Sequence, residues 1–438
     1  MTDGFAKEDC RGKIGGGRNK TSEVIIEEAK DFILSLPLLP SHYCRRDSTK
    51  LYLPGEFKNI TNLHRVYQAH FPNKKTMSFK VFSAWFHKYF NIGFHIPKKD
   101  KCVLCISAKS YDCKTEEEMN IIMKHQEEKE ESYKRFVFHQ KLNKIDNGTV
   151  CASFDLQKVL NTPHGESMLL YYTRKFSVYN LTIYESNTQL GICNTWTEAD
   201  AKRGANEIAT CLLAYLKDVD KRGYVKQVIL YCDSCFGQNK NKSILAMLRY
   251  ALTICENINN IQINYLIPGH TYMPVDSMHA TIENSLKKTI VWAPSQWPTI
   301  MELARKNPEP YVVNVMTGKD FLGFENIVER TYKKNQTINI SKICTVTFHK
   351  KHANKMFVKT SMLPGTEATE IQLGPLNNVI PKQNLYTSKL PISQKKYTDL
   401  KKMIDKNLIP ERFAKEYLSL KTSTKVIDCL PDTDEEDD

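Results

Sequence analysis

Apolar residues recur at helical spacing through the first ninety positions, and this pattern predicts helices over residues 22–36, 61–71 and 78–90. Ser22 and Ser78 stand where an N-cap belongs, and Pro37 stands where the first helix has to end. The inner face of the third helix is expected to consist of four phenylalanines: Phe79, Phe82, Phe86 and Phe90. The N-terminal region should therefore be a small helical domain.

The outer face of the third predicted helix is basic, with Lys80, His87 and Lys88. Two helices joined by a short turn, with a basic outer face, are typical of a helix-turn-helix DNA reader. A plain helical bundle shows the same pattern. We prefer DNA reading by these three residues and keep the plain bundle as the alternative.

Residues 115–144 are rich in Glu and Lys and free of Gly and Pro, which predicts one long charged helix. A solvated spacer helix is the preferred interpretation because the apolar heptads are broken. A coiled-coil seam, and with it a homo-oligomer, is the alternative.

From residue 149 the sequence pattern changes, and short apolar runs typical of strands alternate with segments of helical spacing. Residues 168–172 and 178–184 are expected to pair as antiparallel strands. Further strands are expected at 190–196, 225–231 and 261–267, and helices at 206–219 and 242–254, with another after the last strand. Three strands, helix, strand, helix, strand, helix is the layout of RNase H-like ribonucleases and transposases.

The expected fold class is therefore α/β, with an RNase H-like mixed sheet as the core. An all-helical, helix-turn-helix-like domain and a small CxxC module should precede that core. The expected divisions are a basic flexible arm (1–21), the helical region (22–96), the CxxC module with the long helix (97–148), the core (149–330), a mixed C-terminal region (331–430) and an acidic tail (431–438).

Four acidic residues fall where such a fold gathers its chemistry: Asp155, Asp233, Asp276 and Glu283. Asp155 ends an apolar stretch that begins at Thr149 and is expected on the first strand of the sheet, and Asp233 is expected at the end of the neighbouring fourth strand (225–231). Asp276 lies where the last strand gives way to a helix, and Glu283 follows two turns later on the same face. Either of these two can be the third acid, and Asp276 can instead be only a helix cap.

Several carboxylates at one sheet edge suit two Mg²⁺ (or Mn²⁺) ions and phosphoryl-transfer chemistry. Glu198 and Glu207 are candidates for further carboxylates. Asn239 and Lys240 follow Asp233 closely and are expected to bind a phosphate backbone or to hold the turn. Cys232 and Cys235 form a CxxC pair around Asp233, and we interpret them as structural thiols.

A second CxxC pair, Cys102 and Cys105, places two thiolates within reach of one Zn²⁺ ion. Cys113 and His125 are the expected further ligands, and His42 and Cys44 are upstream alternatives. The spacing matches no standard zinc finger, and two buried thiols without a metal are the competing interpretation.

The 438 residues carry 62 Lys and Arg against 49 Asp and Glu, a formal net charge of +13. This surplus favours an anionic partner, DNA first and RNA as the alternative. Thirteen scattered cysteines suit a reducing compartment. No signal-peptide pattern or membrane-length apolar run is apparent, so we expect a nuclear or alternatively cytoplasmic protein with no membrane partner.

Several segments together resemble a family of invertebrate proteins derived from DNA transposons, with an uncharacterised RNase H-like domain of the DDE/D transposase type. They are SHYCR (41–45), PKKDKCVLC (97–105), FDLQKVLNTPHG (154–165), YYTRKFSVYNLTIYE (171–185), WTEADAKRGANEIATCL (196–212), YCDSCFGQNKN (231–241) and GHTYMPVDSMHATIE (269–283). The resemblance implies a DDE/D core with Asp155, Asp233 and then Asp276 or Glu283 as its acids. It also implies that the CxxC pair belongs to a small metal-binding module before the core.

We therefore expect a transposon-derived DNA-binding protein that cuts or joins DNA strands with Mg²⁺. The alternatives are a domesticated DNA-binding or chromatin-interaction protein without catalysis, and an RNA-processing nuclease. The presence of all the expected acidic residues favours the catalytic alternative. Family members carry a cysteine-rich region before the point where this chain begins, and its absence here favours the domesticated protein.

Overall fold

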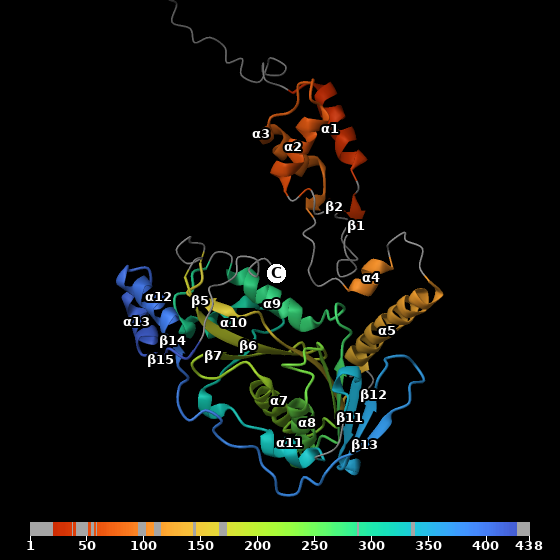
Figure 1. The fold of residues 1–438 in the computed structure, drawn as a ribbon, viewed down its shortest axis with the longest axis vertical. Helices are drawn as coiled ribbons and strands as arrows, with labels where there is room; N and C mark the ends of the chain where they lie inside the picture. Colours follow the sequence, from red (N-terminus) through yellow and green to blue (C-terminus); the bar gives the residue numbers. More distant parts are fainter. Residues whose placement is uncertain are drawn as a thin grey trace, which may run out of the picture. The chain divides into compact units, whose positions relative to one another are not determined.

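The computed structural model describes residues 21–36, 38–40, 51–53, 57, 59–94, 102–108, 115–142, 146–165, 173–286, 289–333 and 338–426 (Figure 1). The chain divides into two compact units, Met1–Lys99 and Asp100–Asp438. Several predictions fall outside the described residues: the basic arm up to residue 20, His42, Cys44, Cys113, the strand at 168–172 and the acidic tail.

The described part of the first unit combines helices with a small sheet, so the prediction of an all-helical region is wrong. The helices are α1 (Glu23–Ser35), α2 (Ile60–His70) and α3 (Phe79–Tyr89). Strands β1 (Leu39–Pro40), β2 (Leu51–Leu53) and β3 (Ile92–Phe94) lie side by side in that order. These strands were missed because two or three residues are too few to show an alternating pattern.

Helix α3 buries Phe82, Trp85 and Phe86 in the core of this unit. Phe79 was expected in that core, but it is 43% exposed at the first position of the helix. Its ring lies at the rim of the cluster, with its centroid 5.6 Å from that of the His64 ring. Lys80, His87 and Lys88 are exposed, and their contact with DNA stays a prediction.

Ten strands among the described residues of the second unit form one mixed sheet, which confirms the prediction of a mixed α/β chain. Its order is β10-β7-β6-β4-β8-β9-β11-β12-β13, with β5 paired to β6. Strand β4 is antiparallel to β6 and parallel to β8, and β8 is parallel to β9. The strands are β4 (Thr149–Leu156), β5 (Leu160–Thr162), β6 (Phe176–Glu185), β7 (Gly191–Thr197), β8 (Gln227–Cys232), β9 (Asn260–Tyr265), β10 (Val312–Val315), β11 (Thr345–His349), β12 (Lys355–Lys359) and β13 (Thr369–Gln372).

Helices cover both faces of this sheet (Figure 1). On one face lie α7 (Ala205–Asp220), α8 (Lys242–Ile254) and α11 (Glu325–Thr331), which pack on Leu230 and Phe154. On the other face lie α9 (Pro274–Leu286), α10 (Trp297–Ala304) and the C-terminal part of α5 (Glu116–Lys141). The short α4 (Val103–Ser107) precedes α5.

The C-terminal region expected to be mixed contains both helices and strands among its described residues. The structure has α12 (Gln394–Asp405) and α13 (Glu411–Leu418), flanked by the paired strands β14 (Ile392–Ser393) and β15 (Thr422–Ser423). Asn407 takes a left-handed backbone (φ 54°) and Pro410 is the N-cap of α13, so the helix cannot continue between them. Short 3₁₀ turns lie at Pro294–Gln296, Gly318–Asp320, Ile340–Lys342 and Lys350–His352.

None of the helices in the described residues is both long enough and apolar enough to cross a membrane.

Candidate metal centres

The alternation of β4 and β8 places Asp155 and Asp233 on the same face of the sheet. Cys151 and Tyr231 point into the apolar cluster on the α9 side, and Asp155 and Asp233 follow them at even spacing. Ser153 pairs with Tyr231 across the parallel strands, and each Asp lies two positions further on. The two carboxylates therefore leave neighbouring strands at the same level.

Helix α9 brings a third carboxylate and a histidine to this position. Asp155, Asp276 and His279 each offer one ligand atom, and these atoms all lie within 4.8 Å of one another. Asp276 lies in the first turn of α9, and His279 comes one turn later and is buried. We call Asp155, Asp233, Asp276 and His279 the acid site.

The acid site is electrostatically unfavourable without a cation. Burial, followed by the charges of Asp233 and Asp276, raises the pKa of Asp155 to about 8. A divalent ion at this position would offset the repulsion between the carboxylates. Carboxylate oxygens with one imidazole form a donor set that such ions accept, so the residues present fit a metal.

The structure favours Asp276 over Glu283 as the third acid. Glu283 is exposed, and its Oε1 accepts a long hydrogen bond (3.5 Å) from Gln157 Nε2. Asp276 Oδ2 also accepts the amide proton of Met273 at 2.7 Å, so the capping interaction and the place in the cluster occur together. The two functions proposed for Asp276 were therefore not exclusive.

Asn239 and Lys240 are buried, which favours the alternative that they hold the turn over contact with a phosphate backbone. The Asn239 side-chain amide donates to Asp233 Oδ1, and the Cys235 amide donates to the same oxygen at 3.2 Å. The ammonium of Lys240 donates to the Ser341 carbonyl at 3.0 Å and lies over the Tyr265 ring. Asn239 thus orients a carboxylate of the acid site, while Lys240 holds the turn.

His279 is the residue of the acid site whose role sequence reasoning missed. The Thr182 hydroxyl donates to the Asp155 carbonyl at 3.1 Å, and a carbonyl can only accept. The same hydroxyl oxygen lies 2.7 Å from His279 Nε2, so Nε2 is the protonated nitrogen and Nδ1 carries the lone pair. Burial lowers the pKa of His279 to about 4, which keeps the ring neutral near pH 7.

Glu198 and Glu207 take no part in the acid site. Both Glu198 carboxylate oxygens accept from the Lys396 ammonium, at 2.7 and 2.9 Å. Glu207 accepts from the Gly204 amide at 2.8 Å and from the Tyr386 hydroxyl. Each carboxylate is held by its own partners, as partly or fully buried charges require.

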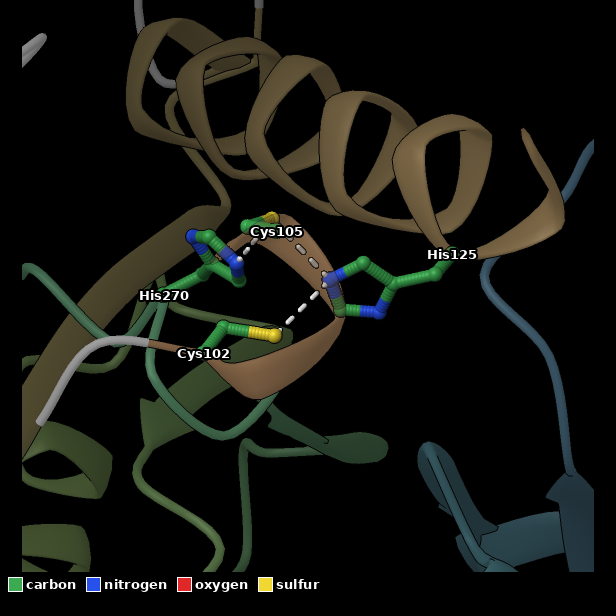
Figure 2. Close-up of side chains that lie close together, drawn as sticks. All are labelled: Cys102, Cys105, His125 and His270. Atoms are coloured by element: carbon green, nitrogen blue, oxygen red, sulfur yellow. Dashed lines mark hydrogen bonds between the residues drawn. The ribbon is translucent and has the colours of Figure 1, made fainter. Parts of the chain in front are cut away.

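A second cluster gathers Cys102, Cys105, His125 and His270, again with ligand atoms within 4.8 Å of one another. Figure 2 shows these four side chains turned toward a common point. Cys102 Sγ lies 3.2 Å from His125 Nε2, and Cys105 Sγ lies 3.4 Å from it. Cys105 Sγ is also 3.3 Å from His270 Nε2.

His270 was absent from the predicted ligands, and Cys113 lies outside the described residues. His270 follows Cys105 by 165 positions, so no local spacing could connect the two. Cys232 and Cys235 belong to no such cluster among the described residues, in keeping with structural thiols.

Comparison with known families gives one match. Residues 186–364 match a family model described as a domain of unknown function, DUF7869. The matched segment contains Asp233, His270, Asp276 and His279, whereas Asp155 and the Cys102–Cys105 pair precede it. No curated protein matches the chain.

Proposed function

We propose that this chain cuts or joins DNA strands with divalent metal ions held at the acid site of an RNase H-like core. The observation that carries the proposal is that ligand atoms of Asp155, Asp276 and His279 lie within 4.8 Å of one another, while the charge of Asp233 on the neighbouring strand helps to raise the pKa of Asp155. Carboxylates that serve only as surface charges or helix caps have no reason to lie close to one another.

The sheet order supports the fold part of the proposal. If the short β5 is left out and the strands are numbered along the chain from β4, the central strands lie in the order three, two, one, four, five. Neighbours among the first three strands are antiparallel, and the last two strands run parallel to the first. An RNase H-like sheet has this arrangement, and its acids lie where Asp155 and Asp233 lie here.

The charge supports nucleic acid as the substrate. The net charge of +13 favours a polyanion, and the exposed Lys80, His87 and Lys88 on α3 are the proposed DNA contacts of the first unit. We include a transposon-derived origin and a nuclear location in the proposal, on the resemblance of the motifs quoted above.

The chain's own residues would hold and orient the reacting groups. Asp155 and Asp233 lie side by side at the carboxyl ends of the neighbouring central strands β4 and β8. The Asn239 side chain and the Cys235 amide fix the orientation of the Asp233 carboxylate. Bound divalent ions would activate a water molecule or a DNA 3′-hydroxyl group for attack on phosphorus, and they would stabilise the leaving oxygen. The attacking oxygen would lose its proton to solvent and form a bond to phosphorus, the bond from phosphorus to the leaving sugar oxygen would break, and that oxygen would take up a proton from solvent.

The function is tested by incubating the purified full chain with supercoiled plasmid DNA and with RNA, in Mg²⁺, Mn²⁺ or chelator. We expect nicking of DNA that requires a divalent ion. Mn²⁺ should support it better than Mg²⁺, because the His279 nitrogen suits a transition metal. Metal-dependent cutting of RNA alone would replace DNA by RNA as substrate, and no cutting of either would contradict the enzyme.

Asp276→Asn should reduce metal-dependent cleavage by at least about a hundredfold, because it removes a charged ligand. Glu283→Gln, on the same helix face two turns later, should reduce it by less than about threefold, because Glu283 is exposed and outside the cluster. Cleavage rates at saturating Mn²⁺ measure both. A reversed order would make Glu283 the third acid.

Asn239→Ala should weaken the apparent Mn²⁺ affinity by about ten- to a hundredfold, because Asp233 loses the amide that orients it. The measurement is the Mn²⁺ concentration that gives half-maximal cleavage. Gln238→Ala, in the same loop, is the matched control and should leave that concentration unchanged. Equal values for the two variants would remove Asn239 from this role.

A further inference from the structure

The cluster of Cys102, Cys105, His125 and His270 has a geometry that hydrogen bonds alone do not explain. His125 Nε2 lies 3.2 and 3.4 Å from two different sulfurs. One ring nitrogen has either one hydrogen or one lone pair, so it cannot satisfy both sulfurs.

A zinc ion accounts for the whole arrangement. Tetrahedral Zn²⁺, with bonds of about 2.1 Å to nitrogen and 2.3 Å to sulfur, spaces these ligands about 3.6 Å apart. The observed sulfur–nitrogen distances of 3.2 to 3.4 Å are close to that spacing. Two thiolates and two imidazoles also complete four-coordination, which is typical of a structural site rather than a catalytic one.

In α4 and the N-terminal half of α5, Ile122 is the buried apolar side chain among the described residues, and Glu128 accepts from the Ser361 hydroxyl and, at 2.7 Å, from the Met362 amide. Among the described side chains of α4, Leu104 and Ile106 are exposed. The C-terminal half of α5 packs on the sheet, where the Phe136 ring lies with its centroid 4.1 Å from that of Tyr231, and His139 Nδ1 lies 2.8 Å from the Tyr231 hydroxyl oxygen. His125 lies on the other, largely exposed half.

His270 belongs to the loop between β9 and α9, six positions before Asp276. The loop turns at Gly269, whose φ of 75° suits glycine, and the His270 amide donates to the Ile267 carbonyl at 2.9 Å. Fixing the His270 ring therefore fixes the point at which α9 begins, and with it the position of the Asp276 carboxylate.

We propose that one zinc ion, bound by Cys102, Cys105, His125 and His270, ties the α4–α5 segment to the β9–α9 loop and thereby positions Asp276. The zinc site is thus part of the second unit, and its His270 lies in the loop that leads into α9, which carries Asp276 and His279. Zinc binding is independent of the proposed nuclease function, and only the importance of Asp276 rests on that function.

The zinc content of the purified full chain tests the ligands. The wild-type protein should retain one zinc per chain after dialysis, and Cys105→Ser and His270→Asn should each bind zinc at least about a hundredfold more weakly. Cys344→Ser and His352→Asn change the same residue types outside the cluster and should keep the metal. Full zinc retention in either cluster variant would overturn the assignment.

Cobalt substitution of the wild-type chain tests the ligands without any mutation. Co²⁺ bound by two thiolates gives an intense sulfur-to-metal charge-transfer absorption, which zinc should abolish by displacement. Bound Co²⁺ without this absorption would exclude Cys102 and Cys105 as ligands. Because the test uses the wild-type chain, it does not depend on whether the variants fold.

Amide hydrogen exchange tests the coupling to the loop. Cys105→Ser is far from this loop in sequence, yet it should accelerate exchange over residues 267–276 while α7 and α8 stay protected. Zinc loss without faster exchange in this loop would leave the metal site standing and overturn its positioning role. Both readouts apply even if the chain cuts no nucleic acid.

Discussion

Asp155→Asn and Asp233→Asn should each reduce metal-dependent DNA cleavage by at least about a thousandfold. The two carboxylates leave adjacent strands at the same level, and each change removes a charged oxygen ligand from the position where cations would gather. Loss of several kcal/mol of transition-state stabilisation corresponds to a rate effect of this size. Initial nicking rates at saturating Mn²⁺ measure it.

Asp218→Asn is the matched control for these variants. Asp218 is an exposed carboxylate on α7 that forms an ion pair with Lys221, one turn away. Its change should leave the nicking rate within about twofold of wild type. Equal nicking by all the variants would show that the observed cleavage does not come from the acid site.

Asp155→Asn should also make the metal-free protein more stable at neutral pH than the wild type. The pKa of Asp155 is about 8 in the folded protein, against an ordinary value of 3.8. Between these two values the unfolded chain ionises Asp155 while the folded chain keeps it protonated. Stability of the wild type therefore falls as pH rises through this window, by at most about 1.4 kcal/mol per unit, and Asn removes that loss.

The measurement is the difference in melting temperature between Asp155→Asn and wild type from pH 5 to pH 8. Buffers should be depleted of Mg²⁺ and Mn²⁺ by a resin rather than a chelator, so that the proposed zinc is kept. The difference should grow with pH, and added Mn²⁺ should reverse its sign because the ion stabilises only the wild-type site. A constant difference, or no response to Mn²⁺, would contradict the electrostatic account of the site.

The sequence pattern predicts the central elements of the second unit well. Helix α8 spans the residues that helical spacing assigns to it, and β7, α7, β8 and β9 lie within a few residues of their expected positions. These elements have one clear apolar face or a fully apolar core, so burial dominates their local preferences. The carboxylates of Asp155 and Asp233 could be located because strand alternation fixes the direction of every second side chain.

The remaining features depend on contacts that local patterns do not carry. Strands β10 and β11 to β13 extend both edges of the sheet, but they are short and only partly buried. His270 joins its cluster through tertiary structure alone. Lys240 looks like a surface charge in sequence, yet it is buried, and its ammonium lies over the Tyr265 ring and donates to a backbone carbonyl.

The central claim is that Asp155, Asp233 and Asp276 together hold divalent ions, and Mn²⁺ anomalous scattering from crystals of the full chain tests it most directly. We predict an anomalous peak about 2.1 Å from carboxylate oxygens of these three residues, and its loss in Asp155→Asn crystals. Mn²⁺ held only by other carboxylates, or no peak here at a concentration that supports cleavage, would contradict the claim.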